Sequence, residues 1–213
     1  MSNPRVLIAD DHRILAEGVR GLLEPKFEVV GIVDDGRELV AAAKELQPDV
    51  IVADISMPSL NGIEAAVQLR DSGVTSKIVF LTQHREVAYA RRAIEAGAAG
   101  FVLKHSVATE LVTAIHEALR GQTYITPMIA GELLDSYRTN DSGEDDSMHR
   151  LTPRQREVLQ LIAEGHSAKQ IAALLKISTR TAEAHRANIL QALGLQSTAE
   201  LVQYAIRNGI ISV

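Results

Sequence analysis

In the first half of the chain, four short apolar segments each end in polar side chains. These are, in chain order, Asp10 with Asp11, then Asp54, Thr82 and Lys104. Three carboxylates close together would repel one another unless a cation compensated them, and hard oxygen donors favour Mg²⁺ over softer metals. A carboxylate beside such an ion can attack a phosphoryl group, while an ammonium and a hydroxyl bind its oxygens. These residue types therefore predict an aspartyl phosphate as the product.

Each of these residues alone has a simpler structural explanation. An aspartate can cap a helix or begin a turn, and a lysine such as Lys104 is most often solvated. Together they indicate a site, because the carboxyl ends of parallel strands meet at one edge of a doubly wound sheet, where ligands bind. The predicted chemistry thus requires the apolar segments to be parallel strands.

The order of elements predicts such a sheet. Near-continuous apolar runs are typical of strands buried on both faces, and they occur at residues 6–9, 29–33, 50–53, 78–81 and 100–103. Segments with helical spacing alternate with them, at residues 12–23, 36–45, 63–71, 85–96 and 108–120. Helix start signals are present at Asp35 with Glu38 and at Asn61 with Glu64. Five successive β-α pairs predict a doubly wound, five-stranded parallel sheet of the flavodoxin type.

The remainder of the chain is predicted to be helical. A helix at 127–138 leads into residues 139–147, a polar, acidic run that indicates a linker. Capping boxes at Thr152 and Ser167 begin two helices, the first with proline at its first position. Two further helices are expected at residues 179–193 and 198–208. Four short helices, with a turn between the second and third, fit an all-α helix-turn-helix domain.

Charge distinguishes the two parts of the chain. Residues 1–147 hold 14 Lys and Arg against 23 Asp and Glu, whereas residues 148–213 hold 8 against 4. A basic terminal segment is typical of nucleic-acid binding, and an acidic one suits metal or phosphate chemistry. Cysteine is absent, which excludes disulfides and thiolate sites. Because no apolar run reaches the roughly 18 residues of a membrane helix, we expect a cytoplasmic protein without a membrane partner.

Four segments of the acidic part match a known pattern. They are Val6-Leu-Ile-Ala-Asp-Asp-His12, Val50-Ile-Val-Ala-Asp-Ile-Ser-Met-Pro58 with Asn61-Gly62, Phe80-Leu-Thr82, and Gly100-Phe-Val-Leu-Lys104. With these motifs, residues 1–122 resemble the receiver domain of bacterial two-component response regulators. The resemblance implies that Asp54 accepts phosphate and that Lys104 holds the phosphoryl group. It also implies that Thr82 and Phe101 are a switch pair, whose hydroxyl and ring reorient on phosphorylation.

The same resemblance implies a Mg²⁺ site. Its ligands would be Asp11, Asp54 and the backbone carbonyl of Ser56, with Asp10 acting through the water shell of the ion. Two positions depart from the usual receiver pattern. His105 stands where many receivers have proline, which excludes a cis-proline there, and the switch threonine is followed by two unusually bulky residues, Gln83 and His84.

The basic part carries a second set of motifs. They include Leu151-Thr-Pro-Arg-Gln-Arg-Glu-Val-Leu159, Ile162-Ala-Glu-Gly165, Lys169-Gln-Ile-Ala172, His185-Arg186 and Leu193-Gly-Leu195. They resemble the LuxR-type DNA-binding domain, and a receiver joined to this domain is the organisation of the NarL/FixJ family. That domain usually has glutamate in place of Gln155 and a β-branched residue in place of Ala182. We therefore expect slightly altered internal packing with function retained.

Candidate DNA contacts lie mainly on the helix at 179–193. Core-facing positions are expected at Ala182, Ile189 and Leu193, which leaves the groove-facing residues Glu183, Arg186, Ala187 and Asn188. Arg186 can read guanine, grip a phosphate or simply be solvated. The resemblance implies contacts to DNA from Lys169, Thr181 and Arg186. It also implies that the last helix pairs two such domains through Leu201, Val202 and Ile206.

We predict a receiver domain at 1–122, a linker helix and acidic linker at 123–147, and a LuxR-type DNA-binding domain at 148–213. The predicted function is that of a DNA-binding transcriptional response regulator, phosphorylated on Asp54 by a histidine kinase to control dimerisation and promoter binding. No separate substrate turnover is expected. The predicted partners are the kinase, an inverted repeat in double-stranded DNA, a second copy of the chain, and RNA polymerase.

Two alternatives belong to other classes. A Mg²⁺-dependent phosphatase of the haloacid dehalogenase type also uses acids after a strand. However, its nucleophile lies in an Asp-x-Asp motif, which the adjacent Asp10 and Asp11 lack, and it would leave the basic domain unexplained. The second alternative keeps DNA binding and treats the receiver as an unphosphorylated dimerisation module.

Overall fold

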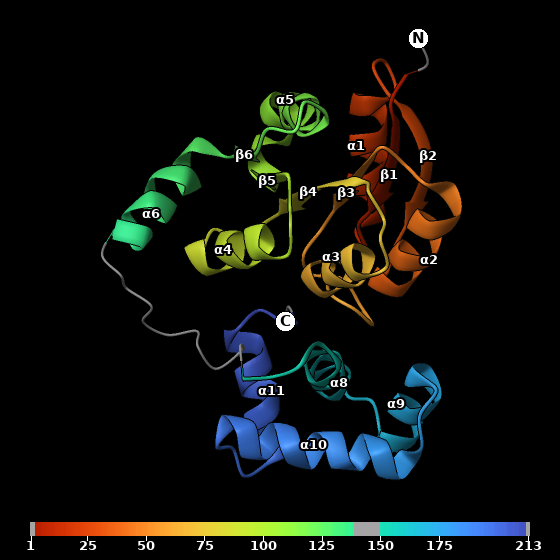
Figure 1. Cartoon of the computed structure of the whole chain (residues 1–213), viewed down its shortest axis with the longest axis vertical. Coiled ribbons are helices and arrows are strands. Elements are labelled where there is room, and N and C mark those ends of the chain that lie inside the picture. The colour runs from red at the N-terminus through yellow and green to blue at the C-terminus, as the bar shows by residue number, and fades with distance from the viewer. Residues whose placement is uncertain (1–2, 139–149, 212–213) are drawn as a thin grey trace.

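The apolar segments of the acidic part assemble into one parallel sheet (Figure 1). The computed structural model describes residues 3–138 and 150–211, and within them the strand order is β2-β1-β3-β4-β5-β6. The strands are β1 (Arg5–Ala9), β2 (Glu28–Val33), β3 (Val50–Ala53), β4 (Lys77–Thr82), β5 (Gly100–Leu103) and β6 (Tyr124–Ile125). The doubly wound α/β fold is confirmed.

The expected count of five strands is wrong for the described residues, because β6 adds a sixth. It pairs parallel with β5, with Ile125 beside Phe101. The backbone N–H of Thr126 extends this pairing and donates to the carbonyl of Phe101 at 2.9 Å. A strand of two residues is too short to give an apolar run or an alternation, so its sequence carries no strand signal.

Helices cover both faces of the sheet. They are α1 (Arg13–Leu23), α2 (Gly36–Leu46), α3 (Gly62–Asp71), α4 (Val87–Glu95) and α5 (Val107–Leu119). Alternate residues of a strand point to opposite faces, so Val6 and Ile8 pack with α1 and α5, while Leu7 and Ala9 pack with α2 to α4. Burial on both faces explains why the strand sequences are continuously apolar.

The expected helices agree with the observed ones to within two residues at each end. Both predicted start signals are present as caps. The Asp35 side chain accepts the backbone N–H of Glu38, and the Asn61 side chain accepts that of Glu64. At His105 the chain forms a 3₁₀ turn over Lys104–Ser106, and the described residues contain no cis peptide bond.

The described remainder of the chain after β6 is helical, as predicted. Helix α6 (Pro127–Arg138) packs on α4, and the predicted acidic linker at 139–147 lies outside the described residues. The later helices are α8 (Pro153–Ala163), α9 (Ala168–Leu175), α10 (Thr179–Leu193) and α11 (Thr198–Arg207). Both capping boxes are formed, and Gln155 takes part in the first by accepting the Thr152 backbone N–H at 2.7 Å.

The helical domain packs directly against the receiver-like domain. In Figure 1, α8 and α11 lie on the side nearest to α3 and α4, whereas α10 lies on the far side. The side chain of Gln160 is fully buried in this contact. It accepts the Asn61 backbone N–H at 2.7 Å and donates to the Met57 carbonyl at 2.9 Å. Two ion pairs of 2.6 Å join the domains, Arg37 with Glu157 and Glu64 with Arg156.

The described part of the chain contains no helix that is both long and apolar enough to cross a membrane.

Candidate phosphoacceptor pocket and DNA-binding face

The sheet brings the predicted carboxylates and the lysine together. Asp10 and Asp54 directly follow β1 and β3 and are buried, with 3% and 2% of their surface exposed. The ammonium nitrogen of Lys104, which follows β5, lies 2.9 Å from Asp10 Oδ2 and 2.7 Å from Asp54 Oδ2. One ammonium thus compensates two buried carboxylates at the carboxyl edge of the sheet.

Burial and charge shift the pKa values in this cluster. Burial raises the pKa of Asp54 to about 6, with the Asp10 charge adding to the effect and Lys104 opposing it. Burial alone would lower the pKa of Lys104, but the Asp54 and Asp10 carboxylates outweigh it and raise that pKa. At neutral pH the pair is therefore ionised, and Asp54 is an anion that its surroundings solvate poorly.

The donor set suits a hard divalent cation. Oxygen or nitrogen atoms of Asp10, Asp11, His12 and Asp54 all lie within 4.8 Å of one another. Carboxylate oxygens predominate, as Mg²⁺ prefers. The imidazole of His12, which is not among the predicted site residues, lies 2.8 Å from an Asp11 oxygen and 3.3 Å from an Asp10 oxygen. His12 directly follows Asp10 and Asp11, so the sequence already places it near them. Its contact with both carboxylates depends on the turn that leads into α1.

The two predicted switch residues lie on neighbouring strands. Thr82 is fully buried at the end of β4, and its hydroxyl oxygen accepts the backbone N–H of His84 at 3.2 Å. Phe101 lies in β5 opposite Phe80 and is 1% exposed. The hydroxyl of Ser56 lies 2.7 Å from Nε2 of His84. In the sequence, His84 stands out only for its size, and its contact with the loop after Asp54 follows from the fold.

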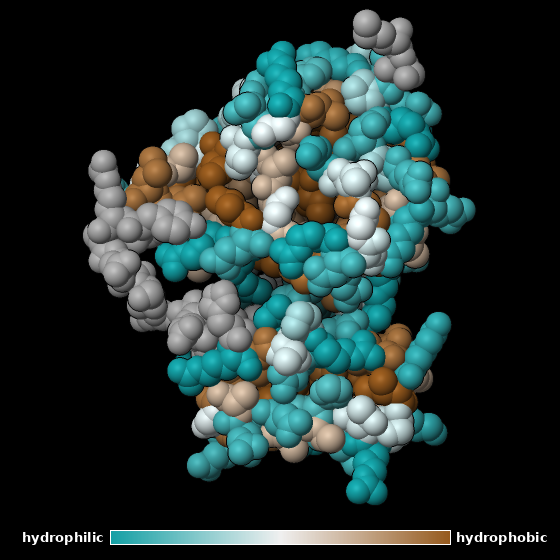
Figure 2. Space-filling view, viewed as in Figure 1, coloured by the Kyte–Doolittle hydropathy of each residue, from teal (hydrophilic) through white to brown (hydrophobic). Residues whose placement is uncertain are grey.

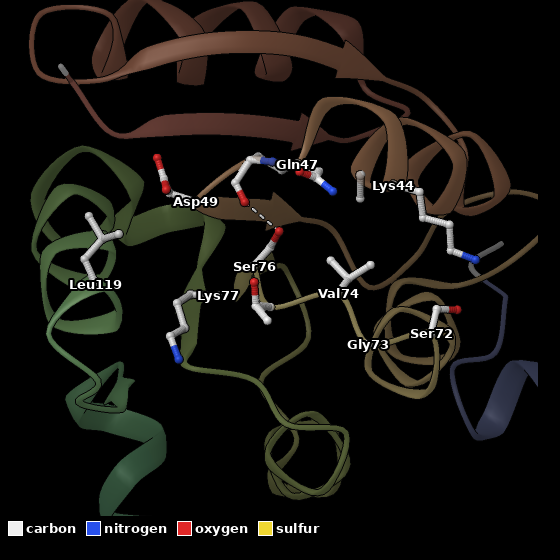
Figure 3. Close-up of a pocket in the computed structure, with 12 residues that line it drawn as sticks. Lys44, Gln47, Asp49, Ser72, Gly73, Val74, Ser76, Lys77 and Leu119 are labelled. Atoms are coloured by element: carbon white, nitrogen blue, oxygen red, sulfur yellow. Dashed lines mark hydrogen bonds between the residues drawn. The ribbon is translucent and has the colours of Figure 1, made fainter.

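A second hollow in the receiver-like domain lies away from this pocket. It has a volume of about 570 Å³ and lies at the opposite edge of the sheet, where β3 and β4 begin (Figure 3). Lys44, Asp49 and Lys77 line it, and the Ser76 hydroxyl donates to the Pro48 carbonyl at 2.6 Å. The predicted catalytic residues do not line it, so the site that the sequence predicts is the acidic pocket.

The predicted DNA-contacting residues are all exposed. Lys169 on α9 and five residues of α10 are exposed, namely Thr181, Glu183, Arg186, Ala187 and Asn188. Ala182 and Ile189 are buried in the helical core as expected, whereas Leu193 is half-buried. Side chains over α10 are mostly hydrophilic in the view of Figure 2. The receiver-like domain therefore does not cover these residues.

One predicted dimer contact does not lie on the surface. Leu201 is 0% exposed and belongs to the core of the helical domain, because the stripe of α11 that packs on α8 includes it. Its side chain is therefore not available to a partner in this structure, which corrects the expectation for Leu201. Val202 is half-buried and Ile206 is 40% exposed, so these two residues remain on the outer side of α11.

Comparison with known proteins agrees with both halves of this description. Residues 6–116 match the response regulator receiver domain, and residues 149–205 match the bacterial regulatory proteins of the luxR family. The transcriptional regulatory protein DegU of Brevibacillus brevis is 34% identical over 225 residues, covering 98% of this chain and 95% of DegU. LiaR of Bacillus subtilis is 38% identical over 211 residues, covering 98% and 99% of the two chains.

A solved structure matches both domains of the chain. The RcsB response regulator of Salmonella typhimurium matches with a TM-score of 0.65 at 28% identity, over 96% of this chain and 97% of RcsB. The fold, the acidic pocket and the exposed helix-turn-helix define a DNA-binding response regulator of a two-component system. The chain belongs to the NarL/FixJ family, in which a receiver domain is joined to a LuxR-type domain. Family membership accounts for the basic domain, which the phosphatase alternative left unexplained.

Proposed function

We propose that a histidine kinase phosphorylates Asp54 and that this modification controls dimerisation and promoter binding. The observation that carries the proposal is the position of Lys104, whose ammonium lies within 2.9 Å of two buried carboxylates. A cation at this point offsets the charge of an incoming phosphoryl group. The Asp54 oxygen attacks phosphorus as the bond to the donor nitrogen breaks. The donor imidazole carries a proton on its other ring nitrogen, so it takes the electron pair of the broken bond and leaves neutral.

Mg²⁺ fits the pocket as the cofactor. Asp11, Asp54 and the Ser56 carbonyl would hold it, with Asp10 acting through its water shell. When bound, Mg²⁺ supplies positive charge to the phosphoryl oxygens. In the proposed mechanism Thr82 contributes its hydroxyl as a hydrogen-bond donor to the phosphoryl group, and Phe101 changes orientation with it. The chain consumes one donor per phosphorylation and turns over no separate substrate.

Helix α1 offers a contact surface for the kinase beside the pocket. Ile14, three residues after Asp11, is 93% exposed. An isoleucine with so much apolar surface in water is stabilised when a partner covers it. A kinase that docks there would bring its phosphohistidine to the mouth of the acidic pocket. The exposed face of α1 thus fits a transient protein contact of this kind.

For DNA we propose contacts from Lys169 and from the exposed residues of α10, Thr181, Glu183, Arg186, Ala187 and Asn188. RcsB, which this chain resembles, has been solved in a complex with DNA. A symmetric pair of helical domains, joined through Val202 and Ile206, would place two copies of α10 in successive major grooves. Such a pair would read an inverted repeat with half-sites about 10 base pairs apart.

We propose that the receiver domain spans residues 1–122, the linker 123–147 and the DNA-binding domain 148–213. The matched segments, 6–116 and 149–205, lie within the two proposed domains. We place the protein in the cytoplasm, where a kinase and DNA are both accessible. RNA polymerase is a further partner in this proposal, since the family consists of transcription regulators.

Phosphate incorporation tests the proposed site. Acetyl phosphate with Mg²⁺ should add one labile phosphate to the wild-type chain, detected by intact-protein mass spectrometry. Asp54→Asn should add none, whereas the matched control Asp71→Asn, which changes an exposed carboxyl at the end of α3, should behave as the wild type. Equal incorporation in Asp54→Asn, or in wild type with excess chelator, would contradict the assignment.

A further inference from the structure

A chain of contacts leads from the acidic pocket toward α4. The Ser56 hydroxyl, two residues after Asp54, lies 2.7 Å from Nε2 of His84. The backbone N–H of His84 donates to the Thr82 hydroxyl oxygen at 3.2 Å. His84 therefore contacts both the loop that follows Asp54 and the proposed switch threonine. A movement of either group changes a hydrogen bond of His84.

The ring of His84 is stacked on the ring of Tyr89, the third residue of α4. The ring centroids are 4.0 Å apart and the ring planes differ by 15°. Tyr89 is 8% exposed, so the stack is nearly closed to water. Stacked aromatic pairs contribute attraction beyond the burial of their surface, so the position of His84 helps to fix the position of Tyr89.

Tyr89 also contacts the end of the helical domain, at Gly209. A Cβ atom added to Gly209 would lie 1.0 Å from the Tyr89 hydroxyl oxygen, so only glycine fits against this ring. Gly209 follows α11 and has a φ of 55°. Beside it, Nη1 of Arg92 lies 3.5 Å from the carbonyl oxygen of Asn208, the C-terminal cap of α11. The end of α11 is thus seated on α4.

A cavity between the domains joins the same two regions. It has a volume of about 350 Å³. Receiver residues Asp11, Ser56, Met57 and Pro58 line one side, and Glu164, His166, Ile210 and Ile211 of the helical domain line the other. The residues that directly follow Gly209 therefore border the loop that contains Ser56. The end of α11 is close to the acidic pocket both through Tyr89 and across this cavity.

We propose that the contacts from Ser56 through His84 and Tyr89 to Gly209 couple the state of the acidic pocket to the docking of the α11 end. This inference rests on the proposed phosphorylation of Asp54. When Thr82 turns its hydroxyl to the phosphoryl group, His84 loses a hydrogen-bond partner and the ring that supports Tyr89 shifts. The seat for Gly209 is then altered and α11 is released. Since coupling is reciprocal, the docked domain also disfavours phosphorylation.

The docking of Gly209 against Tyr89 can be tested without any phosphodonor. Gly209→Ala is compared with Gly194→Ala in the full chain. Gly194 follows α10, has a φ of 67° and has no other atom within 4 Å of an added Cβ. Both substitutions therefore strain the backbone of the helical domain, but only Gly209→Ala collides with Tyr89. Circular dichroism checks that each variant is folded.

Docking can be followed by energy transfer between two dyes. Because the chain has no cysteine, single cysteines at the exposed positions Glu45 and Gln191 can carry the two labels. We expect a loss of transfer in Gly209→Ala and none in Gly194→Ala. Tyr89→Leu, which removes the stacked ring from the receiver side, should give the same loss. Unchanged transfer in folded Gly209→Ala and Tyr89→Leu would overturn the proposed seat.

To test whether His84 couples phosphorylation to docking, His84→Ala is compared with Gln83→Ala, which changes an exposed neighbour. After acetyl phosphate treatment, wild type and Gln83→Ala should lose transfer, whereas His84→Ala should lose markedly less at equal phosphate incorporation. A full response in phosphorylated His84→Ala would overturn the coupling but leave the proposed function intact. A wild type that takes up no phosphate would overturn the proposed function, and the coupling with it, whatever the docking measurements show.

Discussion

The acidic pocket and the DNA-binding face place their charged residues in opposite environments. In the pocket, Asp10 and Asp54 are buried and depend on Lys104 for compensation. On α10, Arg186 is exposed. A buried charge without its partner is costly, whereas an exposed charge contributes little to folding. The functional residues of the receiver domain therefore also affect its stability. The exposed DNA-contacting residues of the helical domain should affect stability little.

Removing the compensating cation should give the largest effect on stability. Lys104→Ala leaves two buried carboxylates without their ammonium, and we expect a loss of about 3 kcal/mol in the free energy of unfolding at pH 8. The loss should shrink near pH 5, because the carboxyls can then become protonated. Urea denaturation without metal measures this. Arg186→Ala is the control, and its free energy of unfolding should change by less than about 0.5 kcal/mol. Equal losses of stability in the two variants would contradict the difference between the acidic pocket and the DNA-binding face.

The raised pKa of Asp54 predicts a pH dependence of stability. Its pKa is about 6 in the folded chain, against a reference value of 3.8. The folded state thus binds more protons between these values, so this group makes the wild type less stable as pH rises from about 4 to about 6. Two pKa units correspond to about 3 kcal/mol as an upper limit.

Asp54→Asn isolates that contribution. Without metal, the stability of this variant relative to wild type should increase across the same pH interval and stay constant above it. The exposed Asp71→Asn should show no such trend. The prediction fails if the difference between Asp54→Asn and wild type is flat from pH 4 to pH 7.

On the DNA-binding face, substitutions should affect binding while leaving the fold unchanged. If Arg186 contacts a base, Arg186→Ala should cost about 1 to 3 kcal/mol on the preferred site and much less on random DNA. Lys169→Ala removes a cation that we assign to the phosphate backbone, so it should weaken all sequences alike and reduce the salt dependence. Fluorescence anisotropy at several salt concentrations separates the two patterns. An equal loss on both DNAs would make Arg186 a phosphate contact.

Much of the fold and pocket could be predicted because the signals are local. Strands covered on both faces are apolar throughout, and the residues after them necessarily meet at one edge of the sheet. Asp54 and Lys104 are 50 residues apart in the chain, yet their strand positions alone predict that they meet. Strand β6 escaped prediction because a pairing of two residues leaves no pattern in the sequence.

Contacts that depend on how elements pack could not be predicted in the same way. Leu201 lies on a helix with apolar residues on more than one side, and only packing decides which of them enter the core. The stack of His84 on Tyr89 depends on the loop before α4, and the fit of Gly209 depends on how the two domains meet. His84 and Tyr89 are separated by five positions, but Gly209 is more than 100 positions away from both.

If phosphorylation of Asp54 controls DNA binding, one titration should show it. Full-length wild type and Asp54→Asn are titrated onto an inverted-repeat duplex, with and without acetyl phosphate and Mg²⁺. We expect the phosphodonor to tighten DNA binding by the wild type and to have no effect on binding by Asp54→Asn. An equal gain in both proteins, or no gain in a wild type shown to be fully phosphorylated, would contradict it.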